Sequence, residues 1–237
     1  MQRYVIASLL VLQTACGGAP AAAPETSETT SGGEEPPAPL VRTTTPVPVP
    51  QPAVAREAMS EALQALWTHI EETIELRPPD GPTAGTQDAV REWAQGPFAT
   101  WLTARRERLQ QATQMSEAIP EDPAYERAVA GGLFGYAIEE MAADVRGAPI
   151  PDDIANDAEL LQIYTESLDE ALRPLATESV QAYAFCASRL RALGDESEWL
   201  PWRAYCVQRG REMVDVYRLY EQAEPPSEQA AEPAPPD

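Results

Sequence analysis

Apolar residues in the middle of the chain recur every three or four positions, which is the spacing of one face of an α-helix. The clearest run advances by four, three, four and four residues through Met59, Leu63, Leu66, Ile70 and Ile74. No segment alternates apolar and polar residues in the manner of a half-buried strand. The pattern therefore predicts an all-α fold built from helical hairpins.

Proline and glycine clusters divide this region into predicted helices. After the first helix, the loop RPPDGPTAG leads to a short helix over about residues 86–95, which Gly96-Pro97 should break. The next predicted helices cover residues 97–118, 124–146, 156–172, 175–193 and 198–221. A kink or a restart is expected at Pro174, because proline lacks the N–H that a helix interior needs. Together these elements predict one helical domain over residues 56–223.

The segments on either side of this domain have the composition of disordered protein. Residues 16–55 consist largely of Pro, Ala, Thr, Glu and Gly, and residues 224–237 are acidic and rich in proline. Neither segment holds enough large apolar side chains to offset the entropy cost of ordering. We therefore predict a disordered tether before the helical domain, extended where prolines alternate in PVPVPQP, and a disordered acidic tail after it.

Residues 1–15 have the pattern of an export signal. Arg3 is the only charged residue among them, and the apolar run that follows is far shorter than the ~20 residues of a membrane-spanning helix. Small residues then lead into Cys16 in the stretch LQTACGG. This stretch resembles the lipobox of bacterial lipoproteins, except that Gln13 stands where the family usually has Leu.

The lipobox resemblance implies that cleavage occurs before Cys16 and that its sulfur receives lipid. Gly17 at the next position implies sorting to the outer membrane, with the protein facing the periplasm or the cell surface. The alternative is an ordinary signal peptide cut near Ala15 or Ala23, which leaves Cys16 lost or free.

The charge of the chain excludes several function classes. The net charge is −21 at pH 7, and removal of residues 1–15 takes away one positive charge and makes it −22. Nucleic acid is therefore excluded as a partner, because its binding depends on Lys and Arg contacts to phosphate. The chain has no Lys, which rules out a P-loop lysine and Schiff-base chemistry. We expect no cofactor.

Cys186 and Cys206 lie ten residues before and ten residues after Glu196, at the centre of the predicted turn GDESE. In an antiparallel helical hairpin they would lie at the same height, and both belong to apolar rows that face inward. In an exported protein this arrangement predicts a disulfide, worth about 3 kcal/mol for a loop of roughly 20 residues. The alternative is two buried free thiols.

The sequence offers few candidates for catalysis or metal binding. His69 is the only histidine, and with Glu72 it supplies fewer than the three protein ligands that zinc needs. Glu139, Glu140 and Asp144 resemble the paired carboxylates of glycosidases, but in so acidic a chain they are interpreted as a solvated helix face. We therefore predict no catalytic and no metal site.

Two further groups of residues could take part in contacts. The basic residues Arg105, Arg106 and Arg108 could meet an acidic partner or pair with nearby glutamates. The spacing of the tryptophans places most of them in the core: Trp67, Trp93, Trp101, Trp199 and Trp202.

The run from Gly135 to Trp199 carries a series of helix-packing positions. The series consists of a small residue at Gly135, an A-P-x-P loop at residues 148–151, Tyr164 and Leu168, the pair Pro174-Leu175, Ala182 with Tyr183, and Trp199. It resembles the C-terminal part of tetratricopeptide-repeat proteins of the bacterial envelope, including gliding-motility-type lipoproteins. The resemblance implies a right-handed array of helical hairpins that serves as a scaffold. Family members carry many repeats before this segment, whereas residues 56–118 show no 34-residue period.

These observations lead us to expect an outer-membrane-anchored lipoprotein whose helical domain binds another envelope protein. The strong negative charge predicts association with basic partners. Two other classes stay open: a small envelope hydrolase that uses Glu139 or Glu140, and a structural spacer. The pattern singles out no binding residues for the partner.

Overall fold

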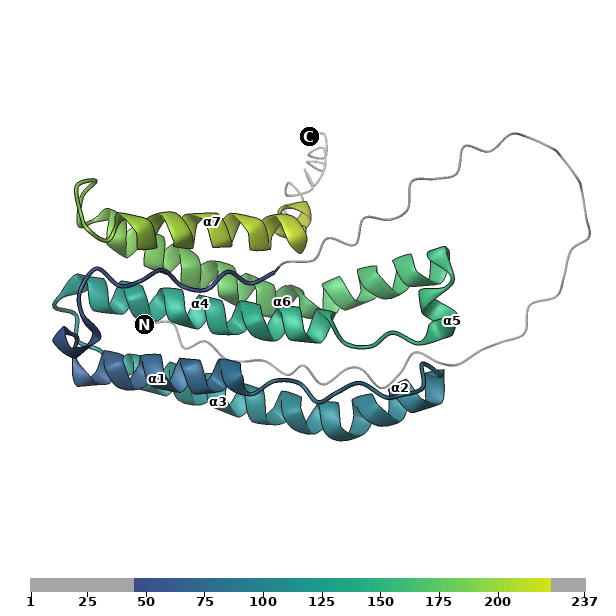
Figure 1. The fold of residues 1–237 in the computed structure, drawn as a ribbon. Coiled ribbons are helices and arrows are strands. Elements are labelled where there is room, and N and C mark those ends of the chain that lie inside the picture. The colour runs from purple at the N-terminus through teal and green to yellow at the C-terminus, as the bar shows by residue number, and fades with distance from the viewer. Residues whose placement is uncertain (1–44, 223–237) are drawn as a thin grey trace, which may run out of the picture. The chain divides into compact units, whose positions relative to one another are not determined.

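The computed structural model describes residues 45–222, and this part of the chain is all-α (Figure 1). The α-helices are α1 (Glu61–Glu75), α2 (Gln87–Trp93), α3 (Ala99–Glu117), α4 (Ala124–Arg146), α5 (Asp152–Ala155), α6 (Ala158–Arg191) and α7 (Leu200–Val216). A π-helical turn, η2 (Ala94–Phe98), joins α2 to α3, and the 3-10 turns η1 (Arg56–Ala58) and η3 (Leu219–Gln222) lie at the two ends. The predicted fold class is confirmed, and residues 45–222 contain no strand.

Helix α4 is the central element of the bundle. It packs against α1 and α3 on one side and against α6 and α7 on the other (Figure 1). Its small residues let the neighbouring helices come close. A Cβ atom placed on Gly132 would lie 3.0 Å from the Trp202 ring, and one on Gly135 would lie 3.0 Å from the Tyr183 ring. All five tryptophans are buried, as their spacing predicted.

The predicted break at Gly96-Pro97 is wrong, because the chain stays helical from α2 through η2 into α3. Proline fits here because the π-turn relaxes the regular hydrogen-bond ladder at this point. Aromatic rings fix the turn. Phe98 stacks on Trp93 with ring centroids 4.5 Å apart and on Trp101 at 5.1 Å. Both indole N–H groups donate to loop carbonyls at 2.8 Å.

Pro174 lies inside the 34-residue helix α6, so the chain does not restart there. The buried residues Leu172 and Ala176 lie on either side of it. Since α6 packs along α4 from this point, tertiary contacts compensate for the backbone hydrogen bond that proline cannot make.

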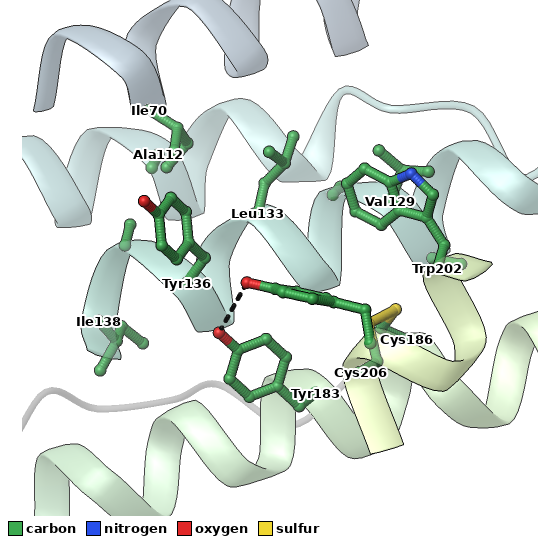
Figure 2. Packing of buried hydrophobic residues seen from close by; sticks show 14 of the residues in the cluster. Ile70, Ala112, Val129, Leu133, Tyr136, Ile138, Tyr183, Cys186, Trp202 and Cys206 are labelled. Carbon is green, nitrogen blue, oxygen red and sulfur yellow. Dashed lines mark hydrogen bonds between the residues drawn. A yellow bond between two sulfur atoms is a disulfide. The ribbon is translucent and has the colours of Figure 1, made fainter. Parts of the chain in front are cut away.

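Cys186 and Cys206 form a disulfide between α6 and α7, as predicted. The sulfur atoms are 2.11 Å apart and the Cα atoms 6.2 Å apart. Figure 2 shows the bridge beside Trp202 and Tyr183 in the buried layer. It therefore fastens the last hairpin at a point where both helices also contact α4.

Residues 45–55, which precede the predicted domain start at Arg56, already pack against the bundle. Residues 45–55 run along α7 in an extended conformation (Figure 1). Val49, Ala53 and Val54 pack against the core cluster. These side chains are small, which is why composition alone assigned the segment to the disordered tether.

Candidate functional site

Glu139 is buried in the centre of the bundle and is not part of a solvated face. Its exposed fraction is 0%, and it forms an ion pair with Arg209, which is 2% exposed. Arg209 Nε donates to Glu139 Oε2 at 3.2 Å, and the Tyr183 hydroxyl donates to the same oxygen at 2.7 Å. A solvated-face interpretation is therefore wrong for Glu139, whose carboxylate has no surface that a substrate could reach.

A second group of charged residues lies between α3 and α4. The Glu140 carboxylate is nearly buried and lies 3.5 Å from the Arg77 guanidinium. Arg105 is fully buried and donates through Nη1 to the carbonyl oxygens of Thr73 and Leu76. Burial lowers the pKa of Arg105, while the negative charge of Asp144 acts in the opposite direction. The solvated-face interpretation therefore also fails for Glu140.

The predicted basic cluster does not exist as a single surface. Arg105 points into the bundle, while Arg108 lies at the surface and its Nη1 atom is 3.0 Å from a Glu72 oxygen. Successive residues are about 100° apart around a helix, so Arg106 lies on another side than Arg105, while Arg108, about 60° from Arg105, lies at the edge of the buried face. Of the two options open for this group, pairing with glutamate holds for Arg108.

The partly buried Asp144 should make the stability of the domain depend on pH. Burial raises its pKa above the ordinary carboxyl value, although Arg105 acts in the opposite direction. The folded state therefore holds this proton to higher pH than the unfolded state, so the contribution of Asp144 to stability falls as pH rises from about 4 through the folded pKa.

We expect Asp144→Asn to be more favourable to stability at pH 7 than at pH 4, relative to wild type, because the amide carries no charge to bury. Urea unfolding at the two pH values measures the difference. Asp215→Asn, at an exposed position of α7, is the matched control. A difference for Asp144→Asn no larger than that of the control would contradict the burial argument.

His69 has a structural role in the described part of the chain. Its Nε2 atom donates to the Arg108 carbonyl oxygen at 2.8 Å, which joins α1 to α3. Within residues 45–222, no three His, Cys, Asp or Glu side chains come together as a metal site would require.

The first half of α6 has exposed apolar side chains. Residues 158–171 include no buried side chain, and the first buried residue of the helix is Leu172. In Figure 1 this half of α6 and the short helix α5 extend past the end of α4. Leu160 is 44% exposed and Ile163 is 53% exposed, one helical turn apart. We call Leu160, Ile163 and the residues around them on this half-helix the α6 face.

The α6 face is surrounded by negative charge. Residues 152–170 contain seven Asp and Glu residues and no Arg or Lys. Glu159 and Glu166 lie four residues before and three residues after Ile163, so both flank it on the helix surface. Asp157 is used locally, since its carboxylate accepts the N–H groups of Glu159 and Leu160 and caps the helix. An apolar stripe with an acidic rim can bind a surface of apolar and basic residues.

The sequence analysis did not identify the α6 face, although a signal was present. The apolar residues of this half-helix occupy a wider arc than one neighbouring helix covers: Leu160, Leu161, Ile163, Tyr164 and Leu168. Three of them, Leu161, Tyr164 and Leu168, are half-buried, which leaves Leu160 and Ile163 at the surface.

The predicted lipidation residue Cys16 and the predicted tail over residues 224–237 lie outside the described residues. No helix in the described range has the length and apolar content needed to cross a membrane. No family model, curated protein or solved structure matches this chain.

Proposed function

We propose that this protein is an outer-membrane lipoprotein whose helical domain binds another protein of the cell envelope. The N-terminal pattern supports the outer-membrane location, since an export signal leads directly into Cys16 and a proline-rich segment. The helical hairpins support a scaffold, and we propose that they form an array of the tetratricopeptide-repeat kind. In this proposal the tether holds the domain away from the membrane and presents it to a partner.

The observation that carries the proposal is the exposed α6 face. Burial of Leu160 and Ile163 by a partner would remove apolar surface from water, at roughly 25 cal/mol per Å². The carboxylates of Glu159 and Glu166 make no salt bridge with a described residue, so they can pair with basic groups of the partner. The partner surface is therefore apolar in its centre and basic at its rim.

The charge of the α6 face also argues against other occupants. A second copy of the chain would bring an equally acidic face, and like charges repel. An anionic membrane surface is unfavourable for the same reason. These considerations favour a different protein with a basic segment.

An envelope hydrolase remains the alternative function, with a structural spacer as the third. Of its two proposed carboxylates, Glu140 retains some exposure and pairs with Arg77 across 3.5 Å. Glu139 is held by Arg209 and Tyr183 and would require opening of the bundle before it could act.

Leu160→Glu combined with Ile163→Glu should abolish partner binding, because it adds two charges to the apolar centre of the α6 face. Mild crosslinking in intact envelopes, followed by purification, measures the recovered partner. Leu193→Glu is the control, since Leu193 is 38% exposed but lies in the turn before α7. The free energy of unfolding, measured by thermal denaturation, should change by less than about 0.5 kcal/mol for each substituted exposed position. Higher salt should reduce recovery of the partner by wild type.

Equal recovery by the double variant and by Leu193→Glu would disprove binding at the α6 face. If Glu140→Gln instead abolished the biological activity while partner recovery was intact, the hydrolase would replace the scaffold as the proposed function.

Cys16→Ser tests the proposed lipid anchor separately. Because the sulfur would be the attachment point of the lipid, the variant should move from the membrane fraction to the soluble fraction and incorporate no fatty acid. Membrane partitioning identical to that of wild type would contradict lipidation at Cys16.

A further inference from the structure

The proline-rich segment over residues 45–54 is bound to the bundle in an unusual way. Prolines occupy positions 46, 48, 50 and 52, so every second residue lacks a backbone N–H. Within residues 45–222, no backbone-to-backbone hydrogen bond connects this segment to another element. The bundle can therefore recognise the segment only through its carbonyl oxygens and its side chains.

Three side chains of α7 donate to these carbonyl oxygens. Trp202 Nε1 donates to Gln51 O at 3.1 Å, and the Tyr205 hydroxyl donates to Val47 O at 2.8 Å. Arg209 Nη2 donates to the carbonyl of Thr45 at 3.4 Å. The donors are spaced three and four residues apart, so they lie along one face of α7 and meet successive parts of the segment.

The alternating prolines of the segment favour the polyproline II conformation. Its half-buried residues are Pro46, Val49, Pro50, Pro52, Ala53 and Val54, whereas Val47 and Gln51 have exposed side chains and inward carbonyls. Donation from aromatic side chains to a polyproline II backbone is a recurring mode of peptide recognition.

The three donors are held in place by the bundle rather than by the segment. Trp202 packs edge-on against Trp67, with ring centroids 5.7 Å apart. Tyr205 lies 5.9 Å from the Tyr183 ring, centroid to centroid. Arg209 is fixed by its ion pair with Glu139. The site is therefore organised independently of its occupant, as ligand sites generally are.

We propose that this face of α7 is a binding site for polyproline II segments, and that residues 45–54 occupy it as a releasable ligand in cis. The proposal goes beyond the partner binding assigned to the α6 face and does not depend on it. Because the occupant belongs to the same chain, its effective concentration is of the order of millimolar for a short flexible connection. An identical peptide added in trans must compete with it.

The test uses the full chain with Pro46→Asp and Val49→Asp, which weakens the cis ligand and leaves α7 unchanged. The probe is the fluorescent peptide TPVPVPQPAV, with TAVAVAQAAV as its control. We expect the variant to bind the probe at least about tenfold more tightly than wild type, because the competing segment has been released. Adding Tyr205→Phe to the variant should weaken binding about threefold to tenfold, since one hydrogen bond is lost.

Three results would overturn the proposal: equal binding of the probe and its alanine control, no gain over wild type, or loss of the folded state in the variant. The last would show that the segment is an integral part of the fold. A second measurement, on the unmodified chain, follows exchange of the Trp202 indole proton by NMR. Release of the segment should let it exchange at least about tenfold faster than the backbone amides around Cys206, whereas exchange only at the rate of global unfolding would also contradict the proposal.

Discussion

Arg209→Met should lower the free energy of unfolding by about 3–5 kcal/mol, the largest effect that we expect from a single substitution in this domain. The reason is that the Glu139 carboxyl group would be left inside the bundle without its buried partner. The substitution also removes the donor to the Thr45 carbonyl. For a domain of this size the melting temperature should fall by roughly 6–20 °C, which circular dichroism at pH 7 would measure.

Arg211→Met is the matched control, because Arg211 is exposed on the same helix and the same chemical change there should stay within about 0.5 kcal/mol. Combining Arg209→Met with Glu139→Leu removes both charges and should cost less than the sum of the two single substitutions. If Arg209→Met were no more destabilising than Arg211→Met, the ion pair would not have the stabilising role argued here.

Loss of the disulfide should have the second largest effect. Cys186→Ala combined with Cys206→Ala is expected to lower the free energy of unfolding by about 3 kcal/mol, because the unfolded chain regains the entropy of a loop that spans 20 residues. Urea unfolding measures the difference. Reduction of the buried disulfide in wild type should lower the free energy of unfolding by a similar amount.

The double alanine variant is also the control for reduction, since a reducing agent should leave its unfolding curve unchanged. Thiol labelling of the denatured, non-reduced protein should find neither Cys186 nor Cys206 free. Full labelling of both, or a reduced wild type as stable as the oxidised form, would contradict a bridge in the mature protein.

Features of the fold that depend on local spacing could be predicted from the sequence. Apolar residues spaced three and four apart predicted α1. The proline-containing loops predicted the bounds of α4 at Ala124 and Arg146. The equal distance of Cys186 and Cys206 from the turn was enough to pair them, because an antiparallel hairpin fixes the register of its two helices.

Features that depend on distant residues could not be predicted in this way. Glu139 is a buried residue only because Arg209, 70 positions later, meets it, and nothing in the local pattern of α4 indicates such a partner. The binding of residues 45–54 is equally hidden, since α7 recognises backbone carbonyls that every sequence possesses. The helix continues through Pro97 because aromatic rings from both sides stack there, which is a tertiary effect.

The α6 face lies between these two cases. Its wide apolar arc is visible in the sequence, but only the structure shows that no other described helix covers Leu160 and Ile163. Exposure of this kind cannot be inferred from periodicity, because the same arc would be buried if α4 were one or two turns longer.

Site-specific photocrosslinking in living cells tests partner binding at the α6 face most directly. A benzophenone amino acid is placed at Ile163 in one chain and at Leu193 in another, both at exposed apolar positions. Partner binding predicts a discrete adduct from position 163 that is absent from position 193 and is lost when Glu159 and Glu166 are both changed to Arg. No adduct from position 163, or the same adduct from both positions, would contradict it.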